Sequence, residues 1–374
     1  MKVCVVGLRG MPDVMGGVET HCEQLLPRLK QRRPDDSFTV IGRKAYLREQ
    51  AFTYRGLQIV SLGHARGRHF ETISNTIYGV LYARFVVHAD LLHLHGIGPA
   101  LTAPLARLLG MKTVITCHSK NYEHRKWNWL ARSALRIGEL FAARFGDRVI
   151  TVSQLLAADL KRRFPRSAHK IHYIPNGADH LKTACEIDSA RDLLGRYGLA
   201  AQRYVVSVGR LVPEKGFHDL LMAFRGANLD GKLVIVGAAD HRDDYATRLL
   251  AQSSGTVVFT GFLPHDSLQV ILSHASLFVL PSYNEGLPIA ALEAAVTQTP
   301  ILLSDIEPHL DLRLSPRNYF RVGNIGDLRH KLEQDHTTYR VDAGALLQRF
   351  NWQLACTETD KLYSSLQKEL AARA

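Results

Sequence analysis

Strand-like apolar runs alternate with helix-like patterns along this chain, and the alternation starts twice. In the first half, the expected strands are Lys2–Leu8, Ser37–Ile41, Leu57–Leu62, Leu91–Leu94, Lys112–Cys117, Arg148–Val152 and Lys170–Ile174. The expected helices between them are Val18–Lys30, Thr72–Val87, Pro99–Leu109, Trp127–Phe145 and Gln154–Arg163. Strands and helices that alternate at this spacing favour a doubly wound parallel sheet.

The second half repeats the pattern after a linker and a first helix within Asn176–Arg203. Its expected strands are Arg203–Val208, Lys232–Val236, Thr256–Thr260, Ser276–Leu280, Pro300–Leu303 and Tyr319–Val322, and its expected helices are Phe217–Arg225, Tyr245–Ser253, Ser267–Ser273, Ile289–Thr297 and Ile325–Gln334. We therefore predict an α/β protein with two Rossmann-like domains, residues 1–180 and 181–351, that face a cleft. The segment of about 352–374 is predicted to be a helix that packs back onto the first domain.

Composition narrows the class of protein. With 46% hydrophobic and 22% charged residues, the 374-residue chain is typical of a globular protein. No apolar run reaches the ~18 residues that a membrane-spanning helix needs, and the start of the chain resembles a first strand rather than a signal peptide. Five scattered cysteines without a Cys-x-x-Cys pair indicate reduced thiols in a cytoplasmic protein.

The net charge of +12 is unevenly distributed. Residues 1–180 contain 27 Lys and Arg against 13 Asp and Glu, a net charge of +14, and the remainder has a net charge of −2. A basic half suits nucleic acid, an anionic membrane or a phosphorylated substrate, or it serves only solubility. One part of it has the aromatic and basic character of a membrane-surface helix, although a core-packed amphipathic helix fits equally well. Its residues are Trp127–Leu130 with Arg125, Lys126, Arg132, Arg136 and Arg144, and Arg66–His69 adds charge nearby in the sequence.

The segment Pro281–Glu293 predicts an anion site. It follows the apolar run Leu277–Leu280 and passes through a Gly/Pro turn into the apolar helix Ile289–Val296. The first amides of a helix have no internal acceptor and lie at the positive end of the helix dipole. Glu285 is expected at the edge of this site and Glu293 about two turns into the helix. A phosphate site with a carboxylate on each side suits a nucleotide sugar.

Two further loops carry candidate phosphate ligands. In Gly209–Gly216, Arg210 lies at an expected strand end and Lys215 just before an expected helix. Two cations at these places suit a diphosphate. The alternative is that both are exposed loop cations without a ligand. The pair Gly16-Gly17 lies between the first strand and the first helix and allows a ligand to approach the backbone, or it is a structural turn. The spacing is not G-x-G-x-x-G, which argues against a dinucleotide-binding dehydrogenase.

Histidines end two of the expected strands. His118 follows Thr116-Cys117 and is expected to point into the cleft, where it would bond a sugar hydroxyl or a phosphate, or it is incidental. His93 and His95 are spaced two apart, and His95 is the better candidate for the cleft. Neither a His-x-x-x-His spacing nor a carboxylate cluster indicates a metal centre, so no metal is expected.

The order of these motifs resembles that of the retaining glycosyltransferases of glycosyltransferase family 4 (glycosyl transferases group 1), which have the two-domain GT-B fold. The resemblance covers most of the chain and is most specific from Val205 to Glu293. The matching positions are Gly16-Gly17, His118, Pro175-Asn176-Gly177, Gly209-Arg210 with Glu214-Lys215-Gly216, and Glu285-(seven residues)-Glu293.

The resemblance implies a role for each matching position. Arg210 and Lys215 would neutralise the donor diphosphate as it leaves, as a metal does elsewhere. Glu293 would hold the ribose hydroxyls, Glu285 the donor sugar, and His118 the sugar or phosphate. The other expected donor contacts are Gly16, Gly17, Gly209, Leu263, Gly286, Leu287, Ile289 and Ala290, with the base beside Thr260–Leu263.

The chain departs from the family pattern at two places. Pro288 stands where many members have glycine and offers no N–H, so phosphate donors must come from further along the chain. Ser304–His309 replaces the usual glycine-rich turn after the next strand. Glu285 is not expected to be a glycosidase-type nucleophile, because no second carboxylate is evident as its acid partner.

The sequence thus predicts a retaining, metal-independent hexosyltransferase that uses a nucleotide-diphosphate sugar and needs no cofactor. The expected acceptor is polyprenyl-diphosphate-linked or another cell-surface glycan intermediate in polysaccharide biosynthesis, which implies a cytoplasmic enzyme peripheral to the inner face of the membrane. The alternatives are a GT-B nucleotide-sugar epimerase and a transferase with a soluble sugar or sugar-phosphate acceptor. Nucleic acid is not an expected partner, because no binding motif accompanies the basic half.

Overall fold

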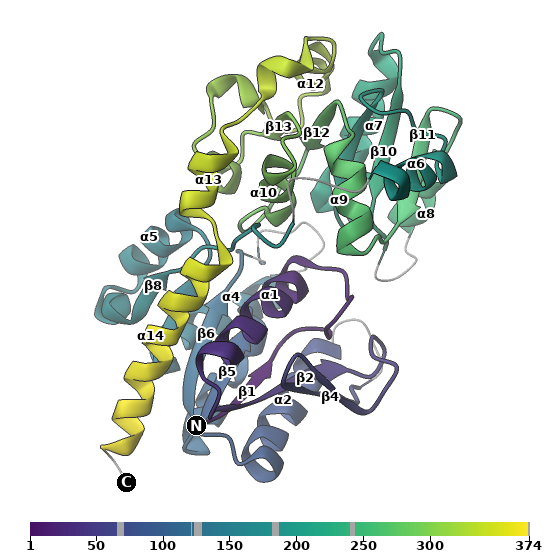
Figure 1. Cartoon of the computed structure of the whole chain (residues 1–374). Coiled ribbons are helices and arrows are strands. Elements are labelled where there is room, and N and C mark those ends of the chain that lie inside the picture. The colour runs from purple at the N-terminus through teal and green to yellow at the C-terminus, as the bar shows by residue number, and fades with distance from the viewer. Residues whose placement is uncertain (66–70, 121, 123–128, 182–186, 240–243, 373–374) are drawn as a thin grey trace. The chain divides into compact units, whose positions relative to one another are not determined.

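The computed structural model of the chain describes residues 1–65, 71–120, 122, 129–181, 187–239 and 244–372 (Figure 1). These residues form two compact units, one made of Met1–Asn176 with Trp352–Ala374 and the other of Gly177–Asn351. In the sequence, the division lies close to the boundary predicted after residue 180. Cys185 and the charged segments 66–69 and 125–127 singled out above lie outside the described residues.

The first unit is built on a sheet with the strand order β3-β4-β2-β1-β5-β6-β7-β8. The strands are β1 (Lys2–Val6), β2 (Ser37–Arg43), β3 (Ala51–Tyr54), β4 (Leu57–Leu62), β5 (Leu91–His95), β6 (Lys112–Cys117), β7 (Arg148–Thr151) and β8 (Ile171–Tyr173). Neighbouring strands pair in parallel, except that β3 and β4 form an antiparallel hairpin at one edge. Strand β3 is not among the predicted strands, because this short edge strand leaves alternate side chains exposed and has no apolar run.

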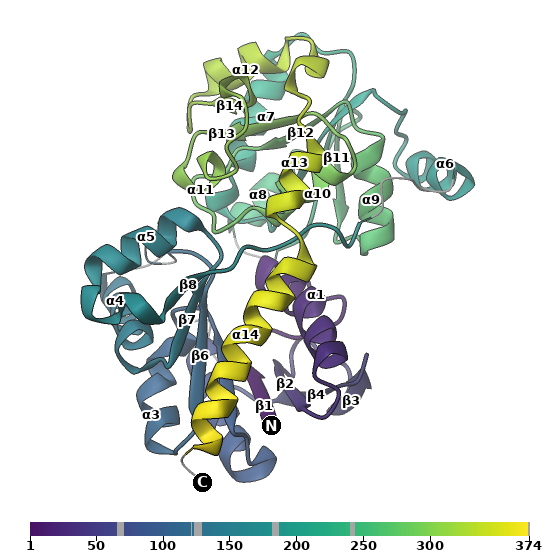
Figure 2. The same ribbon diagram turned by 60° about the vertical axis from the view of Figure 1, so that its left-hand side comes forward.

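Helices cover both faces of this sheet. On one face, α1 (Gly17–Arg32) packs against α14 (Trp352–Ala371), and the two lie side by side in Figure 2. On the other face, a single hydrophobic core joins the strands to helices contributed by successive crossovers. These are α2 (Glu71–Tyr82), the π-helical η1 (Ala83–Val87), η2 (Pro99–Thr102), α3 (Ala103–Leu108), α4 (Trp129–Phe145) and α5 (Gln154–Arg163), which is followed by η4 (Pro165–Lys170).

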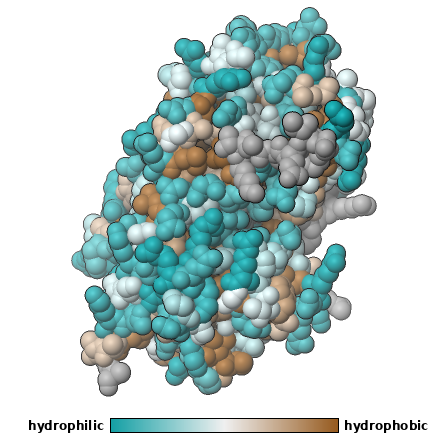
Figure 3. All heavy atoms as spheres, in the orientation of Figure 1, coloured by the Kyte–Doolittle hydropathy of each residue, from teal (hydrophilic) through white to brown (hydrophobic). Residues whose placement is uncertain are grey.

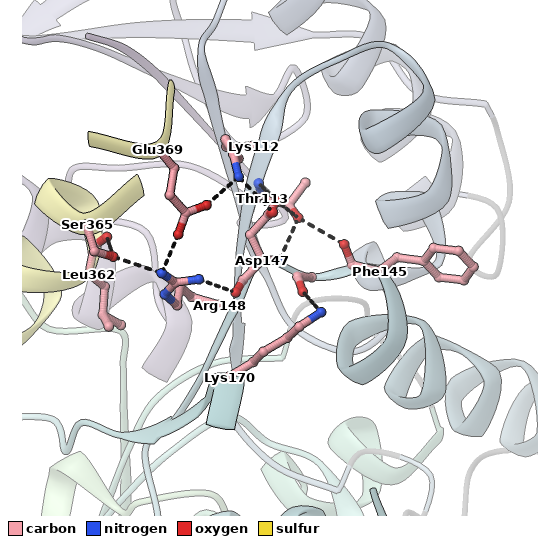
Figure 4. Close-up of polar contacts among 10 residues, drawn as sticks. Lys112, Thr113, Phe145, Asp147, Arg148, Lys170, Leu362, Ser365 and Glu369 are labelled. Carbon is pink, nitrogen blue, oxygen red and sulfur yellow. Dashed lines mark hydrogen bonds and ion pairs between the residues drawn. The ribbon is translucent and has the colours of Figure 1, made fainter. Parts of the chain in front are cut away.

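Helix α14 is fixed to the first unit by ion pairs at its end (Figure 4). The carboxylate of Glu369 accepts from Lys112 Nζ at 2.5 Å and from Arg148 Nη2 at 2.7 Å. Arg148 also donates to Ser365 Oγ at 3.1 Å. Nearer the start of α14, the hydroxyl of Tyr363 lies 2.7 Å from Nδ1 of His93, which belongs to β5 in the middle of the sheet. The last helix of the chain therefore belongs to the unit in which the chain begins.

The second unit has a parallel sheet with the strand order β11-β10-β9-β12-β13-β14. Its strands are β9 (Tyr204–Val208), β10 (Lys232–Val236), β11 (Val257–Gly261), β12 (Leu277–Leu280), β13 (Ile301–Ser304) and β14 (Tyr319–Phe320). Its helices are α6 (Ile187–Arg196), η5 (Pro213–Lys215), α7 (Phe217–Gly226), α8 (Asp244–Leu250), α9 (His265–Ser273), α10 (Ile289–Val296), α11 (Glu307–Leu310), η6 (Pro316–Asn318), α12 (Ile325–Leu332), η7 (His336–Tyr339) and α13 (Ala343–Arg349). The predicted α/β class with two doubly wound sheets is confirmed.

Two short helices of the second unit escaped the sequence analysis. Helix α11 has only four residues, and α13 begins where Asp342 accepts from the amide of Ala345 at 3.0 Å. Helix α8 ends at Leu250, earlier than the predicted Ser253. Among the described residues, Cys4, Cys22, Cys117 and Cys356 are free and buried. None of the described helices combines the length and the apolar character that a bilayer crossing requires.

Candidate functional site

Lys215 is positioned by a turn that only glycine allows. After β9, the chain passes through Gly209 and Arg210 into η5, and Gly216 then adopts a φ of 67° before α7 begins. A Cβ at Gly216 would lie 2.0 Å from the carbonyl oxygen of Pro281, at the end of β12. The loop after β9 is therefore pressed against the loop after β12. This contact joins the two loops that the sequence analysis selected as phosphate ligands.

Two hydrogen bonds from Tyr283 reinforce the contact between these loops. Its amide donates to the carbonyl oxygen of Glu214 at 2.8 Å, and its hydroxyl donates to Asp219 Oδ2 in α7 at 2.6 Å. Gly209 lies against the stem of Lys215, since a Cβ there would be 3.2 Å from Lys215 Cε. Arg210, the other predicted diphosphate ligand, is half-buried in the same loop.

Lys215 and Glu285 form an ion pair. The ammonium group of Lys215 lies 2.5 Å from Glu285 Oε1, which also accepts from Ser282 Oγ at 2.7 Å. Burial alone would raise the pKa of Glu285, but the charge of Lys215, the nearby His309 and the two hydrogen bonds together lower it. Glu285 is therefore a carboxylate, and the structure unites two side chains to which the sequence analysis gave separate tasks.

His309 completes this group, and the sequence analysis did not select it. It is fully buried in α11, and its Nδ1 donates to the carbonyl oxygen of Ser304 at 2.8 Å. Burial and the charge of Lys215 lower the pKa of His309 to about 4, although Glu285 opposes the shift, so the ring is neutral. Its Nε2 has no hydrogen-bond partner within the described part of the chain. The segment Ser304–His309, noted above as a departure from the family pattern, thus carries a histidine beside Glu285.

The start of α10 provides the predicted amide donors. The amides of Ala291 and Leu292 donate to the carbonyl oxygen of Pro288 at 3.1 and 3.3 Å. The preceding amides, those of Ile289 and Ala290, come before the first of these bonds and lack an intrahelical acceptor, as expected for the first turn of a helix. Gly286 and Leu287 are also predicted donor contacts. In the sequence they lie between Glu285 and the start of α10.

Glu293 is the fifth residue of α10, so the expectation that it lies two turns into the helix is wrong by about one turn. It is buried, and its Oε1 lies 3.0 Å from Nε2 of His180. The ring of His180 contacts that of His265 edge to face, with centroids 5.0 Å apart. His265 begins α9 two residues after the buried Leu263, so this group adjoins the predicted base-binding turn. Neither His180 nor His265 was predicted as a site residue, because both are far from Glu293 in the sequence.

In the first unit, His118 belongs to a cluster of histidines. It follows β6, and its Nε2 lies 3.1 Å from Nδ1 of His95 at the end of β5. His21 of α1 contacts His118 edge to face, with centroids 4.9 Å apart, and its Nδ1 lies 2.7 Å from Asn176 Oδ1. His93, next to His95, lies 2.7 Å from the hydroxyls of Tyr363 and Thr116. Of the four histidines, His93, His95 and His118 were noted in the sequence and His21 was not, whereas Asn176 belongs to the Pro175-Asn176-Gly177 motif named above.

Burial keeps these four imidazoles neutral. It lowers the pKa of His21 to about 4 and that of His93 to about 3. Burial and the neighbouring histidines lower the pKa of His95 and of His118 well below the usual value. His118 can therefore donate or accept a hydrogen bond, but it cannot supply a positive charge at neutral pH.

The glycine pair lies at the start of α1, on the same helix as His21. Gly16 is the N-cap residue, and among the described residues beyond the helix's own first turn a Cβ at Gly17 would meet nothing within 4 Å. The loop before it is held by Glu19, whose Oε1 accepts from the amide of Arg9 at 2.9 Å. The space beside Gly17 and its position in the first turn suit an anion that approaches the helix end.

Two groups of side chains have their ligand atoms within 4.8 Å of one another among the described residues, close enough to hold a metal ion. One consists of His21, His95 and His118, and the other of His180, His265 and Glu293. The side chains of each group come from separate elements, so no local spacing in the sequence predicted either group. Hydrogen bonds within or beside each group already account for much of this proximity, and metal independence stays a prediction.

Comparison with known proteins connects both units to one family. Residues 15–181 match the family model described as Glycosyltransferase Family 4, and residues 198–313 match that described as Glycosyl transferases group 1. Together the two segments cover more than half of the chain. The chain belongs to glycosyltransferase family 4. The resemblance inferred from the motif order is thereby confirmed.

Among curated proteins, the chain is similar to 2-deoxystreptamine N-acetyl-D-glucosaminyltransferase of Streptomyces fradiae. The two are 31% identical over 229 residues, which cover 57% of this chain and 54% of the other, so this chain spans about half the length of that relative. It is also similar to alpha-maltose-1-phosphate synthase of Mycolicibacterium smegmatis, with 27% identity over 331 residues that cover 82% of this chain and 80% of the other.

Solved structures share the fold. Sucrose-phosphate synthase from Thermosynechococcus elongatus superposes with a TM-score of 0.81 at 20% identity, over 100% of both chains. Anabaena HepE in complex with UDP and glucose superposes with a TM-score of 0.76 at 20% identity, over 98% of this chain and 100% of the other. At these identities the likeness establishes the fold, which is GT-B.

Proposed function

We propose that the chain is a retaining, metal-independent hexosyltransferase that uses a nucleotide-diphosphate sugar. The observation that carries the proposal is the ion pair between Lys215 and Glu285, located in the two loops before α7 and α10. A cation, an ionised carboxylate and the start of a helix are the groups that a sugar diphosphate requires. Family membership and the UDP-glucose bound to the structural neighbour HepE support the same donor class.

The diphosphate is proposed to bind Arg210, Lys215 and the first amides of α10. In the reaction, the bond between the anomeric carbon and the diphosphate oxygen breaks, and its electron pair stays on the leaving phosphate. The acceptor hydroxyl attacks from the face that the diphosphate leaves, so the anomeric configuration is retained, and the hydroxyl proton passes to the leaving phosphate. Lys215 and Arg210 stabilise the charge that develops on that phosphate.

Glu285 is proposed to hold the ammonium group of Lys215 in place and to accept a hydrogen bond from the donor sugar. Its lowered pKa supports both tasks, since both require the carboxylate form. Glu293 is proposed to bind the ribose hydroxyls through the oxygen that is not bonded to His180, with the base beside Leu263. In the other unit, neutral His118 would exchange a hydrogen bond with the sugar or phosphate, and the amide of Gly17 would bind phosphate.

The acceptor is proposed to be a lipid-linked glycan intermediate at the inner face of the membrane. The net charge of +14 in residues 1–180 supports an anionic acceptor. A soluble acceptor is the second candidate, favoured by the names of the relatives, which include a 2-deoxystreptamine transferase and a maltose-1-phosphate synthase. A nucleotide-sugar epimerase remains the alternative that would consume the donor without any acceptor.

A thermal-shift screen tests the donor site. The purified chain is melted with UDP, GDP, ADP, TDP and their common sugar conjugates, once in EDTA and once with Mg²⁺ or Mn²⁺ added. A rise in the melting temperature with one nucleoside diphosphate, equal in EDTA and in metal, is the expected result. A shift that needs the metal refutes metal independence, and the absence of any shift refutes the donor site. The variant Lys215→Ala should abolish the shift, whereas Lys361→Ala, on an exposed turn of α14, should not.

A further inference from the structure

The outer face of α2 and η1 is hydrophobic and exposed. Ile73, Ile77, Leu81 and Phe85 recur every four residues and form one stripe along the helix, and the side chain of Phe85 is 62% exposed. Tyr78 and Val86 beside the stripe are also exposed. In Figure 3, hydrophobic surface lies at the lower end of the first unit, where α2 lies in Figure 1.

The inner face of the same helix carries polar side chains. Asn75 is buried and donates to the carbonyl oxygen of Leu62 at 3.3 Å, and Thr76 is buried one residue later. Buried Glu71 lies 3.0 Å from Nη1 of Arg43. Helix α2 therefore turns polar residues inward together with Gly79 and Val80, while its large aliphatic side chains Ile73, Ile77 and Leu81 lie on the outer face. A contiguous exposed apolar stripe of this kind marks a surface that binds a partner or a membrane.

Helix α4 has a second exposed face with a related composition. Its apolar members are Trp129, which is 73% exposed, and Leu130, Ile137 and Leu140. Arg132, Arg136 and Arg144 lie exposed among them. The acid of this helix, Glu139, is buried and paired with Arg163, so it does not contribute charge to the surface. Aromatic, aliphatic and arginine side chains on one helix face are typical of helices that lie in a membrane interface.

The two faces belong to the same layer of the first unit. One core cluster contains Val80 and Ala83 from α2 and η1, Ala106 from α3 and Ala142 from α4. Because these side chains point to the same face of the sheet, the opposite faces of their helices point away from it together. Segment η2 packs against both α2 and α4, and α3, which follows it, ends in Leu108, whose side chain is 83% exposed.

Charge identifies the partner. The stretch from Thr72 to Ala89 contains no Asp or Glu, and the acid of α4 is buried, whereas arginines of both segments are exposed. A second copy of the chain would place these arginines opposite one another, which is unfavourable in a symmetric contact. An anionic bilayer accepts the arginines at its headgroups and the apolar side chains below them.

We propose that the outer faces of α2–η1 and α4 dock on the surface of an anionic lipid membrane. The contact itself does not depend on the transferase reaction, but its purpose, delivery of the enzyme to a lipid-linked acceptor, rests on the proposed function. The exposed hydrophobic residues of the described second unit do not form such a face, because each comes from a different element or loop. They are Met222, Leu250, Phe262, Leu310 and Val322.

Vesicle flotation tests the proposal with the full chain. Vesicles of phosphatidylcholine alone are compared with vesicles of phosphatidylcholine and phosphatidylglycerol in equal parts, at low and high salt. Binding is expected to the anionic vesicles only, and it should weaken as salt screens the arginines. The double variant Ile77→Ser/Phe85→Ser should bind the anionic vesicles at least about tenfold more weakly than the wild type, because the apolar contact is lost. Arg132→Gln/Arg136→Gln should weaken binding mainly at low salt.

The matched control is Met222→Ser, which removes a side chain that is 59% exposed on the second unit and should leave vesicle binding unchanged. Circular dichroism and the nucleotide thermal shift establish that each variant is folded. The proposal is wrong if the wild-type chain ignores anionic vesicles at low salt, or if Ile77→Ser/Phe85→Ser binds them normally. Lipid-free dimerisation that the same double variant abolishes would assign the surface to a second copy instead. Vesicle binding without any nucleotide shift would uphold the surface and refute the donor site.

Discussion

Acidification is expected to destabilise the first unit through its buried histidines, and His93 allows the effect to be calculated. An unfolded histidine takes up a proton as the pH falls below about 6.5. In the folded chain, burial lowers the pKa of His93 to about 3. Between these two values the unfolded state binds more protons than the folded state, so the free energy of unfolding decreases as the pH falls.

The size of the effect follows from the distance below the unfolded pKa. At about pH 5, which is about 1.5 units below that pKa, His93 should destabilise the folded state by about 2 kcal/mol relative to neutral pH. His21, whose pKa is lowered to about 4, should add a similar amount. The lowered pKa values of His95 and His118 act in the same direction.

The variant His93→Gln removes this titration and keeps a side chain that can bond Tyr363 or Thr116. Both proteins lose unfolding free energy between about pH 7.5 and pH 5, and the loss in His93→Gln should be smaller than the loss in the wild type by about 2 kcal/mol. Urea unfolding followed by tryptophan fluorescence measures it, because all three tryptophans lie in the sequence ranges of the first unit. His169→Gln, at an exposed position of the same unit, is the control. Equal losses of stability in His93→Gln and the wild type would refute the reasoning.

Three further substitutions test the second unit. Lys215→Ala should lower turnover by about 100-fold or more without unfolding the chain, since it removes charge from the transition state; a near-normal rate in a steady-state assay would contradict the diphosphate assignment. Glu293→Gln should raise the donor KM by about tenfold and change kcat little, and a selective loss of kcat would argue against a ribose contact. Gly216→Ala should destabilise the second unit by about 2 kcal/mol or more in thermal unfolding, because its Cβ would meet the Pro281 carbonyl; an unchanged melting temperature would show that the loops can separate.

Most elements of both sheets could be predicted from the sequence because parallel strands are buried on both faces. Such strands appear as short continuous apolar runs, as in Leu277–Leu280, and the crossovers between them are long enough to hold helices. Strand β3 lacks this signal, since it is a half-exposed hairpin edge. The return of α14 to the first unit depends on contacts such as Glu369 with Lys112, which are far apart in the sequence and follow no local pattern.

The candidate site was predictable only where one motif carried it. Lys215, Glu285 and Glu293 each stand in a loop or helix whose local composition suggests phosphate or hydroxyl binding. His309, His180 and the neighbours of His118 could not be selected in this way, because a single histidine in the sequence carries no information about what it meets. Their contacts depend on which strand ends lie next to one another and on which side chains point to that edge. No local pattern predicts which side chains of the loops after β12 and β13 lie next to one another.

The environment of Glu285 favours one kind of chemistry over another. A glycosidase acid must keep its proton near neutral pH, which requires a raised pKa. Here burial is outweighed by the charge of Lys215 and by the hydrogen bonds from Lys215 and Ser282, which lower its pKa instead. Glu285 is therefore better suited to balance the charge of Lys215 until a diphosphate arrives than to protonate a leaving group. Under the proposed function, the leaving phosphate would be stabilised by cations and amides, and the second unit offers the side chains of Lys215 and Arg210 and the start of α10 for this task.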